Sequence, residues 1–285
     1  LDLIGPNTIS ADIKIGIDKM YVLKNLRDFA YARANSNDLM YGIDFVYNPV
    51  NNYFSEEDEK IVDMIEEYGM GISYIAPQRE LRYMTVGGPQ VRRIMEALQY
   101  RDFEFKFRNM YYNPRIIKGE LPININLEMD DEQILLNCKG MLPVPISQKG
   151  DVIFYKGDIY LLSAESGIYY NKLYKVLDEF KEISFTKDEV SEVLTNVVPK
   201  IKNICSNVFI DAKIEDNISG ELQVKYYFDL EGSKITCDVK FEYEGENEGK
   251  FVIKDIEKEK EAIYRLYTYY FEEEKGKYIF KGNDY

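Results

Sequence analysis

The residues best suited to contacting another molecule lie between Arg79 and Lys118, where basic and aromatic side chains are interleaved. This segment carries nine basic residues against four acidic ones, whereas the whole chain has a formal net charge of −14. Cations attract phosphates and aromatic faces stack on bases, which is the combination that contacts to single-stranded nucleic acid use. The candidate contact residues are Arg79, Arg82, Arg92, Arg93, Arg101, Lys106, Arg108, Arg115 and Lys118.

Two other interpretations of this basic segment remain open. The phenylalanines within residues 103–107 alternate with charged residues, as they would in an ordinary half-buried strand. Arg92 and Arg93 could equally face solvent or pair with nearby carboxylates. The segment is therefore a candidate for DNA contact, for contact with a protein partner, or for no role beyond solubility.

Residues for catalysis are scarce. The chain contains no histidine, which removes the commonest general base, the usual catalytic triads and histidine-containing zinc sites. No GxxxxGK[ST] sequence is present, so nothing cradles the phosphates of ATP. Cys138, Cys205 and Cys237 lie too far apart for a CxxC pair and are expected to be reduced thiols, with Cys237 in the core. We expect no catalytic residue, no metal and no cofactor in this chain.

Carboxylates are plentiful, and four glutamates lie close together in residues 242–248. Glu242, Glu244, Glu246 and Glu248 lack the spacing and central glycine of a calcium loop, which favours a solvated acidic loop. A hydrolytic pair of carboxylates elsewhere stays open, because its members need only be close in space.

Composition indicates a folded protein. A chain of 285 residues, with 45% hydrophobic and 30% charged residues, is long enough to bury a core in one or two domains. No segment approaches the length of apolar sequence that a membrane helix needs, which is about 20 residues. With three scattered cysteines and no leader sequence, a cytoplasmic location is expected. The absence of an initiator Met suggests a piece of a longer protein.

The clearest elements lie at residues 222–280. Leu222 to Leu230 and Ile235 to Tyr243 alternate between apolar and polar residues, which predicts two strands with one buried face, joined by a turn at residues 231–233. Asp255 is a good N-cap for a helix with apolar residues at three- and four-residue spacing. The sequence therefore predicts a β-hairpin with a helix packed across it.

Two further hairpin–helix units are predicted, near residues 13–34 and 152–180. The fold class that follows is α+β, with mostly antiparallel strands, packed helices and an open question of whether the units repeat. Residues 1–120 form the expected N-terminal part and residues 121–285 a strand-rich C-terminal part. A single domain remains the alternative.

Two stretches carry a resemblance to a known family. The sequence YFDLEGSKITCDVKFEYEGEN, continued by IKDIEKEKEAIYRLYTYYFEEEKGKYIF, resembles the bacterial Swi/Snf-type helicase-associated domain. A second similarity lies at residues 15–65, with IGIDKMYVLKNLRDFAYA and YGIDFVYNPVNNYFSEEDEKIVDMI. Their order along the chain is that of the family.

The resemblance implies a function that the residues alone do not. It implies a non-catalytic accessory or regulatory domain of a bacterial Swi/Snf-family ATP-dependent DNA translocase, which positions or regulates the motor. The expected partners are the motor domains of the parent chain, with DNA as a candidate contact of the basic segment. The alternative is an acidic protein-interaction module of another multidomain protein.

Overall fold

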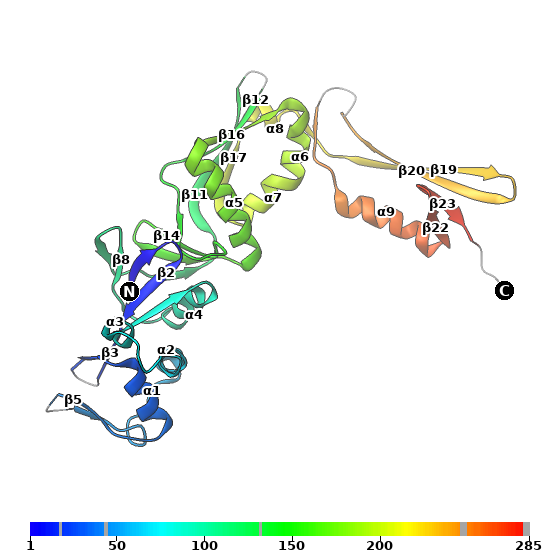
Figure 1. Ribbon diagram of the computed structural model, residues 1–285. Helices are drawn as coiled ribbons and strands as arrows, with labels where there is room; N and C mark the ends of the chain where they lie inside the picture. The colour runs from blue at the N-terminus through cyan, green and yellow to red at the C-terminus, as the bar shows by residue number, and fades with distance from the viewer. Residues whose placement is uncertain (17–18, 43–44, 131–132, 246–249, 282–285) are drawn as a thin grey trace. The chain divides into compact units, whose positions relative to one another are not determined.

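The computed structural model describes residues 1–16, 19–42, 45–130, 133–245 and 250–281 of the chain (Figure 1). The chain divides into two compact units that interleave along the sequence. The first consists of Leu1–Pro122 and Met141–Glu179, and the second of Ile123–Gly140 and Phe180–Tyr285. Helices are combined with mostly antiparallel sheets, which confirms the α+β prediction.

The first part of the first unit contains short hairpins and two helices. Asn25 accepts a hydrogen bond from the Asp28 backbone N–H and so caps α1, and Ser55 caps α2 in the same way through Asp58. The elements are β1 (Asp2–Gly5), β2 (Thr8–Asp12), β3 (Lys14–Ile15), β4 (Tyr21–Val22), α1 (Leu26–Ala34), β5 (Leu39–Tyr41), β6 (Phe45–Tyr47) and α2 (Glu56–Met70).

The rest of the first unit builds two sheets around one core. The first sheet has the order β7-β2-β1-β8-β9 and the second the order β10-β15-β14-β13. The ring of Phe154 lies 5.5 Å from that of Phe105 and 4.5 Å from that of Phe107, so residues from β8 and β14 share the core. The elements are α3 (Gln78–Arg82), β7 (Tyr83–Gly87), α4 (Pro89–Ala97), β8 (Phe105–Phe107), β9 (Met110–Tyr112), β10 (Ile116–Lys118), β13 (Val144–Pro145), β14 (Val152–Tyr155), β15 (Asp158–Leu161) and α5 (Ala164–Phe180).

The second unit begins with a four-stranded sheet of order β16-β12-β11-β17. Its helical segment continues through Pro199, which is the second residue of α7 and directly follows the π-helical turn. Thr186 and Glu189 form a capping box at the start of this segment. The elements are β11 (Leu121–Asp130), β12 (Gln133–Lys139), β16 (Glu182–Thr186), a 3₁₀ turn (Lys187–Glu189), α6 (Val190–Glu192), a π-helical turn (Val193–Val197), α7 (Val198–Lys202), β17 (Cys205–Ile210) and α8 (Ala212–Glu215).

The remainder of the second unit is the predicted hairpin with its helix. β19 and β20 pair antiparallel from Leu222 opposite Tyr243 to Glu231 opposite Lys234, in a sheet of order β19-β20-β23-β22. Gly232 has φ +66° in the two-residue turn, a conformation that glycine adopts without strain. The elements are β18 (Ile218–Ser219), β19 (Leu222–Glu231), β20 (Lys234–Tyr243), β21 (Phe251–Val252), α9 (Ile256–Thr268), β22 (Phe271–Glu274) and β23 (Lys277–Phe280).

The prediction that one whole face of the hairpin is buried is wrong at its far end. Phe228 and Leu230 are 62% and 67% exposed, whereas Cys237 is fully buried. The reason is that the core of this sheet is small, with Cys237, Leu266 and Phe271 as its buried residues, and Phe228 lies at its border with its ring 5.9 Å from that of Phe271.

The three hairpin–helix units do not form one array within the described residues. The β3–β4 pair stands alone, β14–β15 belongs to the sheet with β10 and β13, and β19–β20 belongs to the sheet with β23 and β22. Each hairpin therefore completes a different sheet.

Candidate functional site

The nine basic residues predicted as contacts all fall in the first unit, on several short elements. Arg79 and Arg82 lie on α3, Arg92 and Arg93 on α4, and Lys106 on β8. Arg101 follows α4, Arg108 lies in the turn between β8 and β9, Arg115 directly precedes β10, and Lys118 is its last residue. No single helix or strand gathers them.

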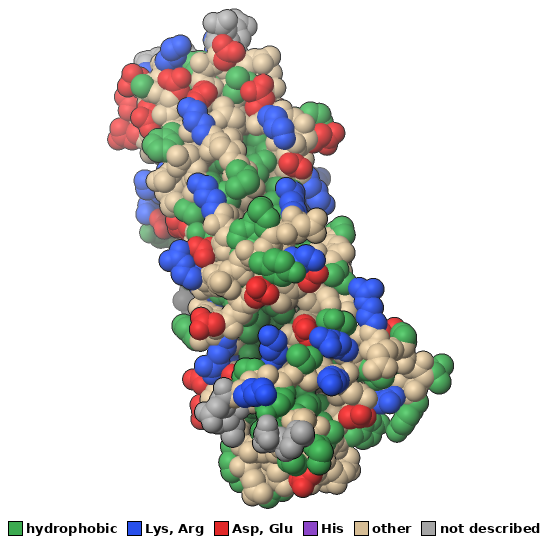
Figure 2. All heavy atoms as spheres, turned by 90° about the vertical axis from the view of Figure 1, so that its left-hand side faces the viewer, with side chains coloured by type: hydrophobic (Ala, Val, Ile, Leu, Met, Phe, Trp, Pro, Cys, Tyr) green, Lys and Arg blue, Asp and Glu red, His purple; other side chains and the backbone are tan. Residues whose placement is uncertain are grey.

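Six of these nine cations form ion pairs with carboxylates. On the face of the molecule drawn in Figure 2, Lys and Arg side chains lie among Asp and Glu side chains rather than forming one basic surface. A phosphate that approached one of these six cations would compete with the carboxylate already bound to it. The pairs are Arg82–Asp12 (3.1 Å), Arg92–Glu96 (2.8 Å), Arg92–Asp151 (3.2 Å), Arg93–Glu67, Arg101–Glu57 (3.5 Å), Arg101–Asp58 (2.8 Å), Lys106–Asp2 (3.2 Å) and Arg115–Asp158 (2.6 Å).

Arg92 is the most deeply engaged of them. Its guanidinium donates to the Leu162 carbonyl at 2.6 Å and to the Asp151 carboxylate at 3.2 Å. Asp151 is 5% exposed and also accepts a hydrogen bond from the Ser147 hydroxyl at 2.6 Å. Arg92 thus supplies the charge that a buried carboxylate requires, and it links α4 to the strands β14 and β15.

Arg115 has a similar role at β10. It holds the Asp158 carboxylate through its guanidinium at 2.6 Å and its backbone N–H at 3.0 Å. These hydrogen bonds lower the pKa of Asp158 from its ordinary value, because they stabilise the charged carboxylate.

The aromatic residues of the basic segment divide into two groups. Phe105 and Phe107 point into the core, as expected of a half-buried strand. Tyr100 and Tyr111 are 80% and 63% exposed. Of the nine basic residues, Arg79, Arg108 and Lys118 have no ion pair recorded within the described part of the chain. The cations that remain available for phosphate contact are therefore these three.

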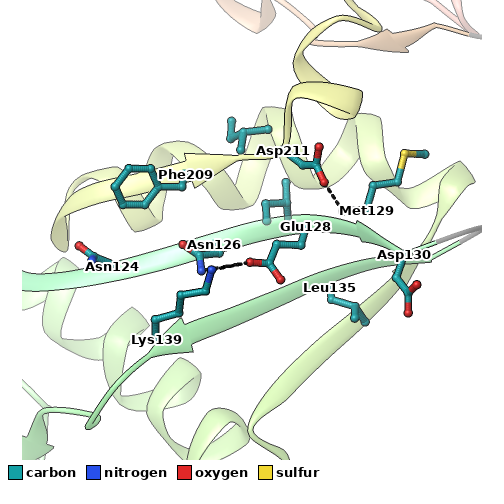
Figure 3. Close-up of a pocket in the computed structure, with 11 residues that line it drawn as sticks. Asn124, Asn126, Glu128, Met129, Asp130, Leu135, Lys139, Phe209 and Asp211 are labelled. Atoms are coloured by element: carbon teal, nitrogen blue, oxygen red, sulfur yellow. Dashed lines mark hydrogen bonds and ion pairs between the residues drawn. The ribbon is translucent and has the colours of Figure 1, made fainter.

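A second candidate site, which the sequence patterns did not single out, is a hollow of about 760 Å³ on the sheet of the second unit (Figure 3). Along β11, Ile123, Ile125 and Leu127 are buried, and the alternate residues turn to the opposite face. The hollow is lined by Asn124, Asn126, Leu127, Glu128, Met129, Asp130, Leu135, Lys139, Phe209, Ile210 and Asp211. The signal in the sequence was the alternation of asparagine with isoleucine at residues 123–126.

Hydrogen bonds and an ion pair fix the polar groups of this hollow. Glu128 forms an ion pair with Lys139 at 2.9 Å and accepts hydrogen bonds from Asn126 and Asn137 at 3.3 and 3.4 Å. The hydrogen bond from Lys139 is the main cause of a lowered pKa of Glu128. Phe209, 54% exposed, borders the hollow from β17.

The hollow combines polar groups with apolar side chains such as Leu135 and Phe209, which suits binding better than catalysis. A carboxylate whose pKa is lowered by a lysine is a poor general base, since it holds a proton weakly.

Within the described residues, no group of three or more acidic or cysteine side chains is arranged to hold a metal ion. Glu246 and Glu248 of the acidic loop lie outside the described residues. In the described part of the chain, no helix is both long and apolar enough to cross a membrane.

Comparison with known proteins identifies a family for the larger part of the chain. A family model described as bacterial SNF2 helicase associated matches residues 82–285, which includes all of the second unit and most of the basic segment. The similarity noted at residues 15–65 lies outside the matched residues. No curated protein and no solved structure was found to match the chain. Because the match spans more than half of its residues, the chain belongs to the family of bacterial SNF2 helicase-associated proteins.

Proposed function

We propose that this chain is a non-catalytic accessory region that positions or regulates the motor of a bacterial SNF2-family, ATP-dependent DNA translocase. The observation that carries the proposal is the family match over residues 82–285. It is supported by a sequence with neither a phosphate-binding P-loop nor a histidine, so that ATP hydrolysis falls to other domains. In such a protein the region works in the cytoplasm, beside the motor domains of its parent chain.

Protein contact is the main way in which this region would act. An acidic surface with a net charge of −14 repels a DNA backbone, and six of the nine cations in the basic segment already pair with carboxylates. A DNA contact is proposed only as an addition, through Arg79, Arg108 and Lys118.

The accessory role is tested by adding the region to its motor. ATP hydrolysis and DNA affinity of the SNF2-family motor are measured with and without residues 1–285 present in the chain. A change in the DNA-stimulated hydrolysis rate or in DNA affinity is the expected result. No change in either quantity contradicts the proposal, and so does ATP hydrolysis by the isolated region.

The DNA contact is tested by changing two of the available cations. In the complete parent protein, Arg108→Ala combined with Lys118→Ala is expected to weaken DNA binding and to reduce the slope of log K against log salt by about one for each lost phosphate contact. Arg93→Ala is the matched control, because Arg93 pairs with Glu67. Equal binding by the double variant and the wild type removes DNA from the proposal.

A further inference from the structure

The strand β19 is an unprotected edge of its sheet (Figure 1). It is ten residues long, contains no proline, and pairs with β20 in an unbroken register, so nothing in its backbone discourages another strand from pairing with it. Its outer side has no strand partner within the described residues. The Leu230 N–H illustrates this, because it donates to the Asp229 carboxylate at 2.8 Å instead of to a neighbouring strand.

The side chains of β19 also favour pairing. Phe228 and Leu230 are 62% and 67% exposed, and Tyr227 on the other face is 47% exposed. The opposite edge of the same sheet, β22, is shorter than β19 and more strongly charged. It is four residues long and carries Glu272, Glu273 and Glu274, the kind of charge that natural edges use against pairing.

The sequence of β19 is complementary to itself when two copies run antiparallel about Tyr227. Lys225, which also forms an ion pair with Glu242 of its own β20, then lies opposite Asp229 of the second copy, and the reverse pair forms on the other side of the axis. On the apolar face, Tyr226 lies opposite Phe228 and Val224 opposite Leu230. No like charges face each other across this interface.

The backbone of β19 suits the same register. The two-residue turn makes Glu231 and Lys234 a hydrogen-bonded pair, and such pairs alternate along the hairpin. The even-numbered residues of β19 therefore direct their N–H and C=O groups outward. With Tyr227 at the axis, even-numbered residues meet even-numbered residues, so the outward groups of both copies meet.

We propose that β19 binds β19 of a second copy of this chain, so that the two four-stranded sheets form one continuous sheet across a two-fold axis at Tyr227. The pairing brings the exposed ring of Phe228 beside Tyr226 of the second copy. The Tyr226 hydroxyl donates to the Ala262 carbonyl of α9 at 3.1 Å. The helix α9 of each copy therefore lies beside the exposed part of the hairpin of the other copy. This inference is independent of the proposed accessory role.

A cysteine placed at the axis tests the register directly. In an antiparallel pair without hydrogen bonds the two Cα atoms are about 4.5 Å apart, which is within the range of a disulfide. Tyr227→Cys is therefore expected to give a covalent dimer under mild oxidation. Gln223→Cys is the matched control, because its counterpart in the second copy lies about 27 Å away, eight residues along the strand at about 3.4 Å each. The wild type, whose Cys205 and Cys237 are buried and whose Cys138 is half-buried, gives the background.

The charge pair gives a second, reversible test. Asp229→Lys places two like charges opposite each other on both sides of the axis and is expected to raise the dimer dissociation constant by about tenfold in sedimentation equilibrium. Adding Lys225→Asp to that variant restores opposite charges and should restore the dimer. Circular dichroism checks that each variant remains folded.

The outcomes separate the second copy from other occupants of this edge. A wild-type chain that stays monomeric at every protein concentration used in sedimentation equilibrium overturns the proposal. So does a dimer that is insensitive to Asp229→Lys, or one in which Tyr227→Cys and Gln223→Cys cross-link equally.

Discussion

Arg92 and Arg93 are neighbours on α4, yet their guanidinium groups have different surroundings. Arg92 meets Asp151, whose side chain is 7% exposed, whereas Arg93 meets Glu67, whose side chain is 59% exposed. A buried carboxylate that loses its cation keeps its desolvation cost, but an exposed one regains water. The two arginines therefore differ in what they contribute to folding.

We expect Arg92→Ala to lower the free energy of unfolding by about 3 kcal/mol, because it leaves Asp151 buried without a cation. Arg93→Ala should lower it by less than about 1 kcal/mol, because its ion pair is exposed to solvent. Urea denaturation of the two variants measures both values. Equal losses would contradict the structural role of Arg92.

The pH dependence of stability provides a test at Asp158. Its folded pKa is lowered from 3.8 by hydrogen bonds from Arg115, so its stabilising contribution is complete above that value. The contribution is lost as pH falls through the folded pKa, because the protonated carboxyl no longer binds Arg115 as strongly. Thermal melts below pH 4 should therefore show a steeper loss in the wild type than in Asp158→Asn. Parallel pH profiles for the two proteins would contradict this assignment.

At the scale of elements, the packing of α1 against α2 depends on Gly69. We find this residue inside the last turn of α2, with Gly71 as the residue that ends the helix. A Cβ at Gly69 would lie 2.4 Å from the Leu26 carbonyl oxygen of α1 and 2.8 Å from the Ala30 Cβ. Glycine is required at this position by the close approach of the two helices.

Gly69→Ala is accordingly expected to destabilise the protein by about 2 kcal/mol, although alanine is the better helix former. Gly71→Ala is the matched control. A Cβ there lies 3.4 Å from the Tyr68 carbonyl oxygen, and its φ of −78° suits alanine, so the change should be neutral or stabilising by up to about 1 kcal/mol. Chemical denaturation of both variants decides the point. A Gly69→Ala variant as stable as the wild type would contradict the close packing.

At the scale of the whole molecule, the two units interleave along the chain. Residues 141–179 return to the first unit after residues 123–140 have joined the second. They supply β15, the parallel partner of β10, and Phe154, whose ring contacts those of Phe105 and Phe107. A cut at residue 120 would therefore remove part of the core of the first unit.

We predict that a fragment of residues 1–120 lacks a cooperative thermal transition, and that a fragment of residues 1–179 has one. The reason is that only the longer fragment contains the strands that bury Phe105 and Phe107. Near-ultraviolet circular dichroism during heating measures the transition. A native-like melt of residues 1–120 would favour the boundary predicted from the sequence, between residues 120 and 121.

Local sequence patterns were sufficient to predict the hairpin and its helix and to indicate the family. The alternation in residues 222–243 located a hairpin whose strands pair over the predicted residues, and Asp255 was identified as a cap from its position before a helical pattern. These features depend on neighbours in the sequence, since strand alternation and capping are local interactions. The resemblance at residues 227–280 likewise falls within the residues that the family model matches.

The sequence by itself thus determined the α+β class, the cap at Asp255 and the absence of a P-loop and of histidine. Only the tertiary structure decided which cations are already paired, which part of the hairpin stays exposed, and that Asn126 and Glu128 line a hollow. The physical reason is distance along the chain. Arg92 and Asp151, or Phe228 and the helix that fails to cover it, are separated by tens of residues, and their contacts depend on how the elements pack.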